Sequence, residues 1–374
     1  MWREPRRAVV VVGLVLAVWA IGCTTRTHPP LHPAEVTGTA LAGKAASSVP
    51  SLRPLSPATS VSLPTTTTPS LVAWSGPVEH LFFHTLVIDS SLAFANDKEG
   101  QGFRDYFVTV QEFRTILDQL YANGWTLVDL HRVVAGTVRV PAGRRPLVIS
   151  EDDVNYYNYE RPRGLGWRLA LDPTGDVKVE VHDATGVHIT DDDLVPLIDE
   201  FVAAHPDFSA DGAKGVLALT GYEGLFGERV QDPNAPGYAA SVARATAIAE
   251  RLKATGWLLA SHSYGHIDLS QTSTAYAQID TQRWRAEAEP IIGPTDIYVY
   301  PFGARPPPRT LAMLSKAGFS IFCDIDVVPR LTHLAGVTIM SRRHIDGLAL
   351  TQQAARLAPL FDARAVLDRI ARRQ

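Results

Sequence analysis

The chain has 374 residues, a formal net charge of −4 at pH 7 and an apolar fraction of 46%. The acidic balance, with no basic block in the part expected to fold, argues against nucleic acid as a partner. The length and composition suit one large globular domain, or one domain with an insertion, after a separate N-terminal segment.

The first residues are typical of an export signal. A short basic segment, residues 1–7, precedes an uncharged apolar run, residues 8–22. This run is shorter than the about 20 residues that a transmembrane helix needs, so it fits a secretory signal. Ala20-Ile21-Gly22-Cys23 resembles a bacterial lipobox, although the third position before the Cys is usually Leu. We therefore expect residues 1–22 to be a signal peptide and Cys23 to carry a lipid. The lipid would anchor the exported protein on the outer face of the bacterial cell membrane, and an ordinary signal or an uncleaved anchor is the alternative.

Residues 23–76 are rich in Pro, Ser, Thr and Ala. Few large apolar residues occur there, so no core can offset the entropy cost of ordering, and we expect a flexible tether. Only two Cys occur in the chain, and if Cys23 is lipidated then Cys323 has no partner, so no disulfide framework is expected. Residues 77–374 are expected to form the folded domain.

Apolar periodicity predicts strands and helices that alternate through most of the domain. The expected strands are residues 80–88, 125–128, 146–150, 215–220, 257–260, 297–300, 319–322 and 337–340, with residues 177–181 as half of a hairpin. The expected helices are residues 109–123, 129–135, 190–204, 238–255, 274–289, 309–317 and the remainder from residue 350. Such alternation predicts a parallel α/β fold, either barrel-like or open.

Two helix starts carry recognisable signals. Thr109 with Glu112 three residues later is typical of a capping box. Thr190 is expected to cap the next helix, whose first turn would be Asp191-Asp192-Asp193. Carboxylates suit a helix N-terminus, so we prefer this interpretation of the acidic triplet to metal binding.

Polar clusters follow several expected strands directly, at the ends where parallel α/β folds place their function. The clusters are Asp152/Asp153, His262/His266, Pro301–Gly303 and Arg342–His344. Adjacent carboxylates at the end of a buried strand are costly unless a cation offsets them. The alternative interpretation is an exposed acidic turn and ordinary loop histidines.

His262 and His266 are four residues apart, so both imidazoles would share one face if the segment turns helical. Two His and one carboxylate leave positions on a metal for water and substrate, which is a catalytic arrangement. A second carboxylate within reach could then accept a proton. His80 and His84 have the same spacing, but their run is strand-like, so we do not expect them to be ligands.

Three of these stretches resemble the motifs of the polysaccharide deacetylases of the NodB-homology type, carbohydrate esterase family four. Ser150-Glu151-Asp152-Asp153-Val154 resembles that family's Thr-Phe-Asp-Asp-Gly. His262-Ser263-Tyr264-Gly265-His266 is an intact His-Ser/Thr-x-x-His motif, and Val299-Tyr300-Pro301-Phe302-Gly303 resembles Arg-x-Pro-Tyr-Gly. The resemblance covers most of the chain from residue 80 to residue 345.

The resemblance implies a distorted (β/α) barrel of the NodB-homology type with an insertion at about residues 155–235, between the first two motifs. It implies a hydrolase that removes N-acetyl groups from an extracellular or cell-wall amino-sugar polysaccharide. It also assigns the site residues: Asp152 as catalytic base, Asp153, His262 and His266 as ligands of one divalent metal, His344 as general acid, and Tyr300, Pro301 and Phe302 as the residues that hold the oxyanion and substrate. His and carboxylate ligands in a hydrolase favour zinc.

The sequence departs from the family at two motif positions, because Val299 replaces the Arg and Val154 replaces the Gly. Arg342 or Arg343 is a candidate to replace the missing Arg from another strand. The departures motivate a second hypothesis, a non-catalytic glycan-binding lipoprotein on a deacetylase scaffold. A serine hydrolase at Ser261–Gly265 is a third, although this stretch lacks the first Gly of the nucleophile elbow. No protein partner can be inferred.

Overall fold

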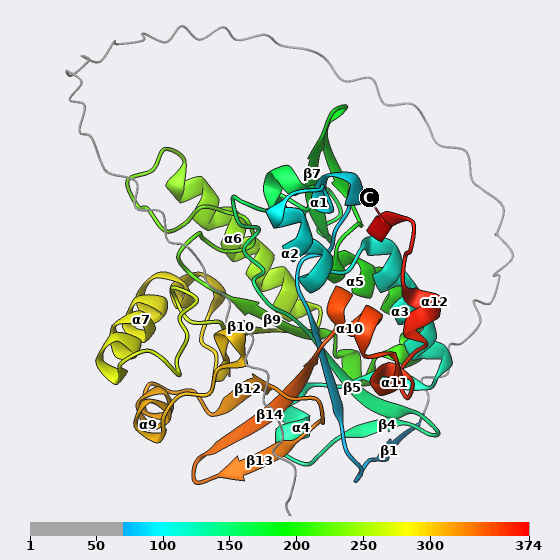
Figure 1. Ribbon diagram of the computed structural model, residues 1–374. Helices are drawn as coiled ribbons and strands as arrows, with labels where there is room; N and C mark the ends of the chain where they lie inside the picture. The colour runs from blue at the N-terminus through cyan, green and yellow to red at the C-terminus, as the bar shows by residue number, and fades with distance from the viewer. Residues whose placement is uncertain (1–69, 374) are drawn as a thin grey trace, which may run out of the picture. The chain divides into compact units, whose positions relative to one another are not determined.

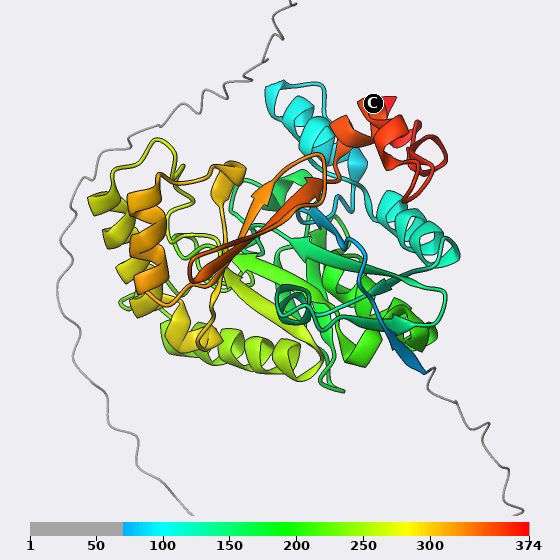
Figure 2. The same cartoon turned by 90° about the horizontal axis from the view of Figure 1, so that it is seen from below.

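The computed structural model describes residues 70–373, and a closed barrel of parallel strands lies at their centre (Figures 1 and 2). Within this part of the chain, the seven barrel strands are β2 (Glu79–Phe83), β5 (Arg145–Glu151), β9 (Gly215–Leu219), β10 (Trp257–Ser261), β11 (Ile297–Val299), β12 (Ile321–Ile325) and β14 (Val337–His344). They pair in the order β2-β5-β9-β10-β11-β12-β14, and the parallel pair β14–β2 closes the ring.

The barrel strands are apolar because both of their faces are buried. All five residues of β9 are buried, and β5 is buried from Pro146 to Glu151. Near-continuous apolar runs of this kind are typical of parallel strands that helices cover from outside. The expected distorted (β/α) barrel is therefore confirmed.

Further strands lie outside the barrel. The described strands outside the barrel are β1 (Leu71–Ala73), β3 (Trp125–Leu127), β4 (Arg139–Pro141), β6 (Arg168–Leu171), β7 (Val177–Asp183), β8 (Gly186–Thr190) and β13 (Leu331–Leu334). Of these, β3 and β13 pair with barrel strands, and the others form two separate sheets. β1 pairs antiparallel with β4, so the folded part begins before residue 77, and the expected tether of residues 23–76 was too long at this end. The predicted signal peptide, Cys23 and the rest of the tether lie outside the described residues.

A three-stranded antiparallel sheet, β6-β7-β8, is added to the barrel between the first two motifs. It lies at the top of Figure 1, where β7 is labelled. The expected insertion at residues 155–235 also included β9, which pairs with both β5 and β10. The three added strands lie within the range in which the insertion was expected.

Helices pack around the outside of the barrel, and α7 and α9 lie side by side (Figures 1 and 2). Their bounds are α1 (Ser90–Ala93), α2 (Lys98–Tyr106), α3 (Val110–Ala122), α4 (Leu130–Val134), α5 (Leu194–Ala204), α6 (Tyr238–Ala254), α7 (Thr274–Glu287), α8 (Glu289–Ile292), α9 (Pro308–Lys316), α10 (Gly347–Gln352), α11 (Ala354–Leu357) and α12 (Ala363–Val366). No helix in residues 70–373 has the length and apolarity of a membrane span.

The two helix-start predictions have different outcomes. The capping box at Thr109 is confirmed, since Thr109 accepts from the Glu112 N–H and Glu112 accepts from the Thr109 N–H. The cap at Thr190 is wrong, because Thr190 ends β8 and Asp193 caps α5. Asp193 is buried and also accepts from the Leu86 N–H (3.2 Å) and the Tyr156 hydroxyl (2.6 Å). Those tertiary hydrogen bonds select Asp193 over Thr190 as the cap.

Candidate active site

Asp153, His262 and His266 come together at the carboxyl ends of β5 and β10. One ligand atom from each lies within 4.8 Å of the other two. His266 Nε2 is 3.7 Å from Asp153 Oδ2, and His262 Nε2 is 4.0 Å from Asp153 Oδ1. One carboxylate and two imidazoles at this spacing fit a single divalent cation with positions left open.

A tight loop, not a helix, brings the two imidazoles together. Ser263 and His266 have left-handed backbone angles, with φ of 58° and 51°. Asp280 on α7 fixes the loop, because its carboxylate accepts from the N–H groups of Tyr264 and Gly265, both at 2.8 Å. The segment after β10 is therefore not helical, and the two histidines converge through this loop instead.

The backbone of the third motif sets the tautomer of His262. His262 Nδ1 lies 2.9 Å from the carbonyl oxygen of Val299. A carbonyl oxygen only accepts, so Nδ1 carries the proton and Nε2 keeps its lone pair. The lone pair of Nε2 is thus directed to the side of Asp153, as a metal ligand requires.

Asp152 is buried beside this cluster and is clamped by Arg342 of β14. The guanidinium donates two hydrogen bonds to the carboxylate, at 2.6 Å and 2.8 Å, and a third to the Ser150 hydroxyl at 3.1 Å. Burial would raise the pKa of Asp152, but the charge of Arg342 and its hydrogen bonds outweigh that effect and hold the pKa below its ordinary range. Asp152 is therefore ionised at neutral pH.

The choice between Arg342 and Arg343 is settled by the alternation of side chains along β14. Arg342 is fully buried and reaches Asp152, whereas Arg343 reaches Glu79 (3.4 Å) and the carbonyl of Arg356 (3.2 Å). Both residues and His344 lie within β14, not after a strand that ends at residue 340 as the sequence indicated. A guanidinium thus faces Asp152 although Val299 replaces the family's Arg.

His84 is the site residue that sequence reasoning missed. Its Nε2 lies 3.9 Å from Asp153 Oδ2, and its Nδ1 lies 3.2 Å from Nε2 of His344. Nδ1 of His344 in turn lies 3.0 Å from the Asp346 carboxylate. Burial, together with the nearby His344, lowers the pKa of His84 to about 4. The signal available in the sequence was position, because His84 directly follows the end of β2.

The third motif contributes one exposed side chain at the site. Phe302 is 50% exposed, has a φ of 59°, and its ring lies 4.5 Å from the His266 ring. Tyr300 is buried and stacks on Phe322 with the ring centroids 5.5 Å apart. The expected substrate contact of Tyr300 therefore does not apply to its side chain, which belongs to the core. Pro301, which lies between Tyr300 and Phe302 in the chain, is buried.

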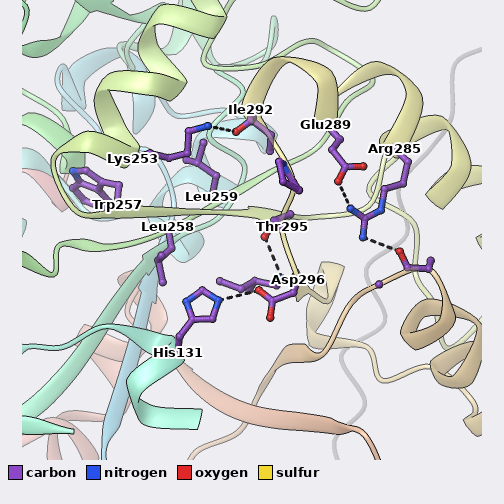
Figure 3. A pocket seen from close by; sticks show the side chains of 14 residues that line it. His131, Lys253, Trp257, Leu258, Leu259, Arg285, Glu289, Ile292, Thr295 and Asp296 are labelled. Carbon is purple, nitrogen blue, oxygen red and sulfur yellow. Dashed lines mark hydrogen bonds and ion pairs between the residues drawn. The ribbon is translucent and has the colours of Figure 1, made fainter. Parts of the chain in front are cut away.

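A cavity of about 590 Å³ lies at the opposite end of the barrel (Figure 3). It adjoins the amino ends of β10 and β11, whereas His262 follows the carboxyl end of β10. Its charged groups pair within the protein, with His131 Nε2 2.9 Å from Asp296 and Lys253 donating to the Ile292 carbonyl (2.8 Å). Hydrogen bonds that His131 donates to the carboxylates of Asp129 and Asp296 raise the pKa of His131 to about 10. The His131–Asp296 pair joins α4 to the residue before β11, and the Lys253 bond joins α6 to α8.

The fold and site together define a class: a parallel (β/α) barrel that carries a candidate metal centre and a buried, ionised carboxylate at the carboxyl ends of its strands. No family model matches the sequence, and no curated protein matches it either.

Solved structures do match this chain. A Streptococcus pyogenes deacetylase, PplD, in complex with acetate has 13% identity and a TM-score of 0.45, covering 75% of this chain and 94% of that one. A de-N-acetylase from Aggregatibacter actinomycetemcomitans has 14% identity and a TM-score of 0.46, covering 76% and 100%. IcaB from Ammonifex degensii has 13% identity and a TM-score of 0.44, covering 75% and 97%. At these identities and scores, no activity is transferred from them, and the function has to be argued from the site.

Proposed function

We propose that this protein is a metal-dependent hydrolase that removes N-acetyl groups from an extracellular or cell-wall amino-sugar polysaccharide. The observation that carries the proposal is the ionised Asp152, clamped by Arg342, directly beside the cluster of Asp153, His262 and His266. A purely binding protein has no use for a proton acceptor held beside metal ligands. The glycan-binding hypothesis rested on the missing motif Arg and Gly, and Arg342 supplies a guanidinium in place of that Arg.

Asp153, His262 and His266 would hold the metal, for which His and carboxylate ligation favours zinc. When bound, such a cation polarises the amide carbonyl and lowers the pKa of water toward 7. Tyr157 donates from its hydroxyl to Asp153 Oδ1 (2.7 Å), which orients the proposed carboxylate ligand.

The chain's own residues would move the protons. Asp152 Oδ2, 3.9 Å from His262 Nε2, accepts the proton of the attacking water. The amide C–N bond breaks as a proton reaches the leaving nitrogen, so the products are acetate and the free amine of the sugar. We assign that proton to His344, which Asp346 orients, with His84 between His344 and the metal ligands. The Phe302 N–H is our candidate to hold the developing oxyanion.

Removing His262 tests the metal assignment. His262→Ala should lose most of the bound metal and all measurable acetate release, because one of three protein ligands is gone. Metal content by mass spectrometry and acetate release from acetylated amino-sugar polymers measure the two effects. A chelator should abolish wild-type release, and added zinc should restore it.

The matched control is His333→Ala, since His333 lies on β13 and hydrogen-bonds only locally to Thr338 (3.1 Å). This variant should keep its metal and its activity. Full metal occupancy in His262→Ala would contradict the ligand assignment. A wild type that holds its metal but releases no acetate would favour the glycan-binding hypothesis.

We also propose that the protein is exported and anchored by a lipid on Cys23, on the evidence of the N-terminal sequence alone. Cys23→Ala should release the protein from the membrane fraction or leave the precursor unprocessed. The measurement is cell fractionation with the mass of the mature form. Unchanged membrane retention and mass would count against lipidation.

A further inference from the structure

Three tyrosine rings stack beside the candidate metal centre. Tyr157 stacks on Tyr159 with the ring centroids 5.8 Å apart and on Tyr222 with the centroids 5.3 Å apart. Tyr157 is buried, whereas Tyr159 is 57% exposed and Tyr222 is 39% exposed. The Tyr157 hydroxyl donates to Asp153, so Tyr157 lies between this proposed metal ligand and the two exposed rings.

The loops that carry these rings are fastened to each other. Tyr157 and Tyr159 follow β5, and Tyr222 follows the neighbouring strand β9. Asn155 and Thr220 exchange two hydrogen bonds, each at 3.0 Å, which join the loops at their bases. Further out, the Asn158 N–H donates to the Glu223 carboxylate at 2.8 Å.

Arg229 also holds the loop after β5, because its guanidinium donates to the carbonyls of Asn155 (3.1 Å) and Tyr156 (2.6 Å). The stacked rings are therefore held in place before any ligand arrives. A preorganised surface loses little entropy when it binds.

Exposed aromatic rings on a fixed wall suit a ligand with a flat apolar face and a polar rim. A tyrosine offers an apolar ring face and a hydroxyl for hydrogen bonding. A pyranose ring matches this surface, because its axial C–H bonds form an apolar face and its hydroxyls surround it.

We propose that Tyr159 and Tyr222 form a subsite that binds a second unit of an amino-sugar chain while the first unit presents its acetyl group to the metal centre. The inference rests on the proposed function and deepens it, since it makes a chain of at least two sugars the preferred substrate over a single sugar. The tyrosines bind and position the substrate and take no part in proton transfer.

The test compares a hexamer of β-1,4-linked N-acetylglucosamine with the single sugar. In Tyr159→Ala and Tyr222→Ala, the ratio of kcat/KM for the hexamer to kcat/KM for the single sugar should fall about tenfold, the equivalent of about 1.4 kcal/mol. The loss should lie in KM for the hexamer, because stacking acts on ground state and transition state alike. Tyr159→Phe keeps the ring and should restore most of the ratio.

Binding of the hexamer to each variant, measured by calorimetry, separates this inference from the proposed function. If wild type releases acetate and the alanine variants keep the wild-type ratio and affinity, the subsite is wrong and the hydrolase stands. If wild type releases no acetate but its hexamer affinity falls in the alanine variants, the subsite stands and the hydrolase is wrong. A hexamer that neither binds nor reacts, or equal losses of kcat on both substrates, overturns the subsite.

Discussion

Replacing Asp152 by Asn should lower kcat for deacetylation by about 10² to 10⁴, the typical contribution of general-base catalysis. Asn keeps the shape of the side chain and removes the proton acceptor. The measurement is steady-state acetate release, with metal content determined on the same samples. Because Asp153, His262 and His266 remain in Asp152→Asn, the bound metal should stay near the wild-type level.

Asp192→Asn is the control for this result, since Asp192 is a partly exposed carboxylate near the start of α5 and pairs only with Arg114 (3.4 Å). It should behave as wild type. Asp152→Asn also leaves the buried Arg342 without its counter-charge, so activity has to be measured well below the unfolding temperature. Wild-type turnover by Asp152→Asn would remove Asp152 from the mechanism.

The convergence of the motifs could be predicted because it follows from topology. Asp152 and Asp153 end one apolar run, and His262 follows another. Once the alternation of strands and helices indicates a parallel sheet, the carboxyl ends of those strands must meet at one end of the barrel. The structure places the motifs at that end, so the alternation of strands and helices was enough to predict that they converge.

The local backbone of the site could not be predicted, because it opposes intrinsic preference. Asp153, Ser263, His266 and Phe302 all have φ between 51° and 60°, in the left-handed region that favours glycine. Such conformations cost energy and persist only where the surroundings impose them. Here the carboxylate of Asp280 holds the two residues between Ser263 and His266, and Asp280 lies on a helix that the motif spacing does not reveal.

His84 was missed, and the choice between Arg342 and Arg343 was left open, for a different reason. The strand-like run from residue 80 concealed that β2 ends at Phe83, so His84 was assigned to the strand and not to its carboxyl end. For Arg342 and Arg343, a one-residue difference in register decides which side chain points inward. The residues of β14 before its two arginines, Val337–Ser341, mix apolar and hydroxyl side chains and are buried throughout, so the sequence does not show that register.

Replacing Arg342 by Met should lower the free energy of unfolding by about 3–5 kcal/mol, the usual cost of removing one partner from a buried ion pair. The Met side chain fills similar space but leaves the Asp152 carboxylate buried and uncompensated. Chemical denaturation measures the loss. Arg343→Met removes the same charge from the next position, where the guanidinium lies 3.4 Å from Glu79 and is not fully buried, and it should cost less than Arg342→Met.

The double variant Asp152→Asn/Arg342→Met tells whether the lost stability comes from the buried charge. With no carboxylate left to desolvate, it should recover part of the loss seen in Arg342→Met, which a double-mutant cycle expresses as a coupling energy. Additive losses would show that Arg342 acts through packing on Phe82, whose ring lies 4.2 Å from the guanidinium carbon, and not through Asp152.

The pH profile of Arg342→Met tests the same pair through catalysis. Asp152 has to be ionised to accept a proton, so kcat/KM falls as the pH drops through its pKa. In the wild type, Arg342 holds that pKa below its ordinary range against the effect of burial. Without Arg342 the pKa rises, and the acidic limb of kcat/KM should move to higher pH, whereas in Arg343→Met it should stay in place. An acidic limb that does not move in Arg342→Met would mean that a group other than Asp152 accepts the proton.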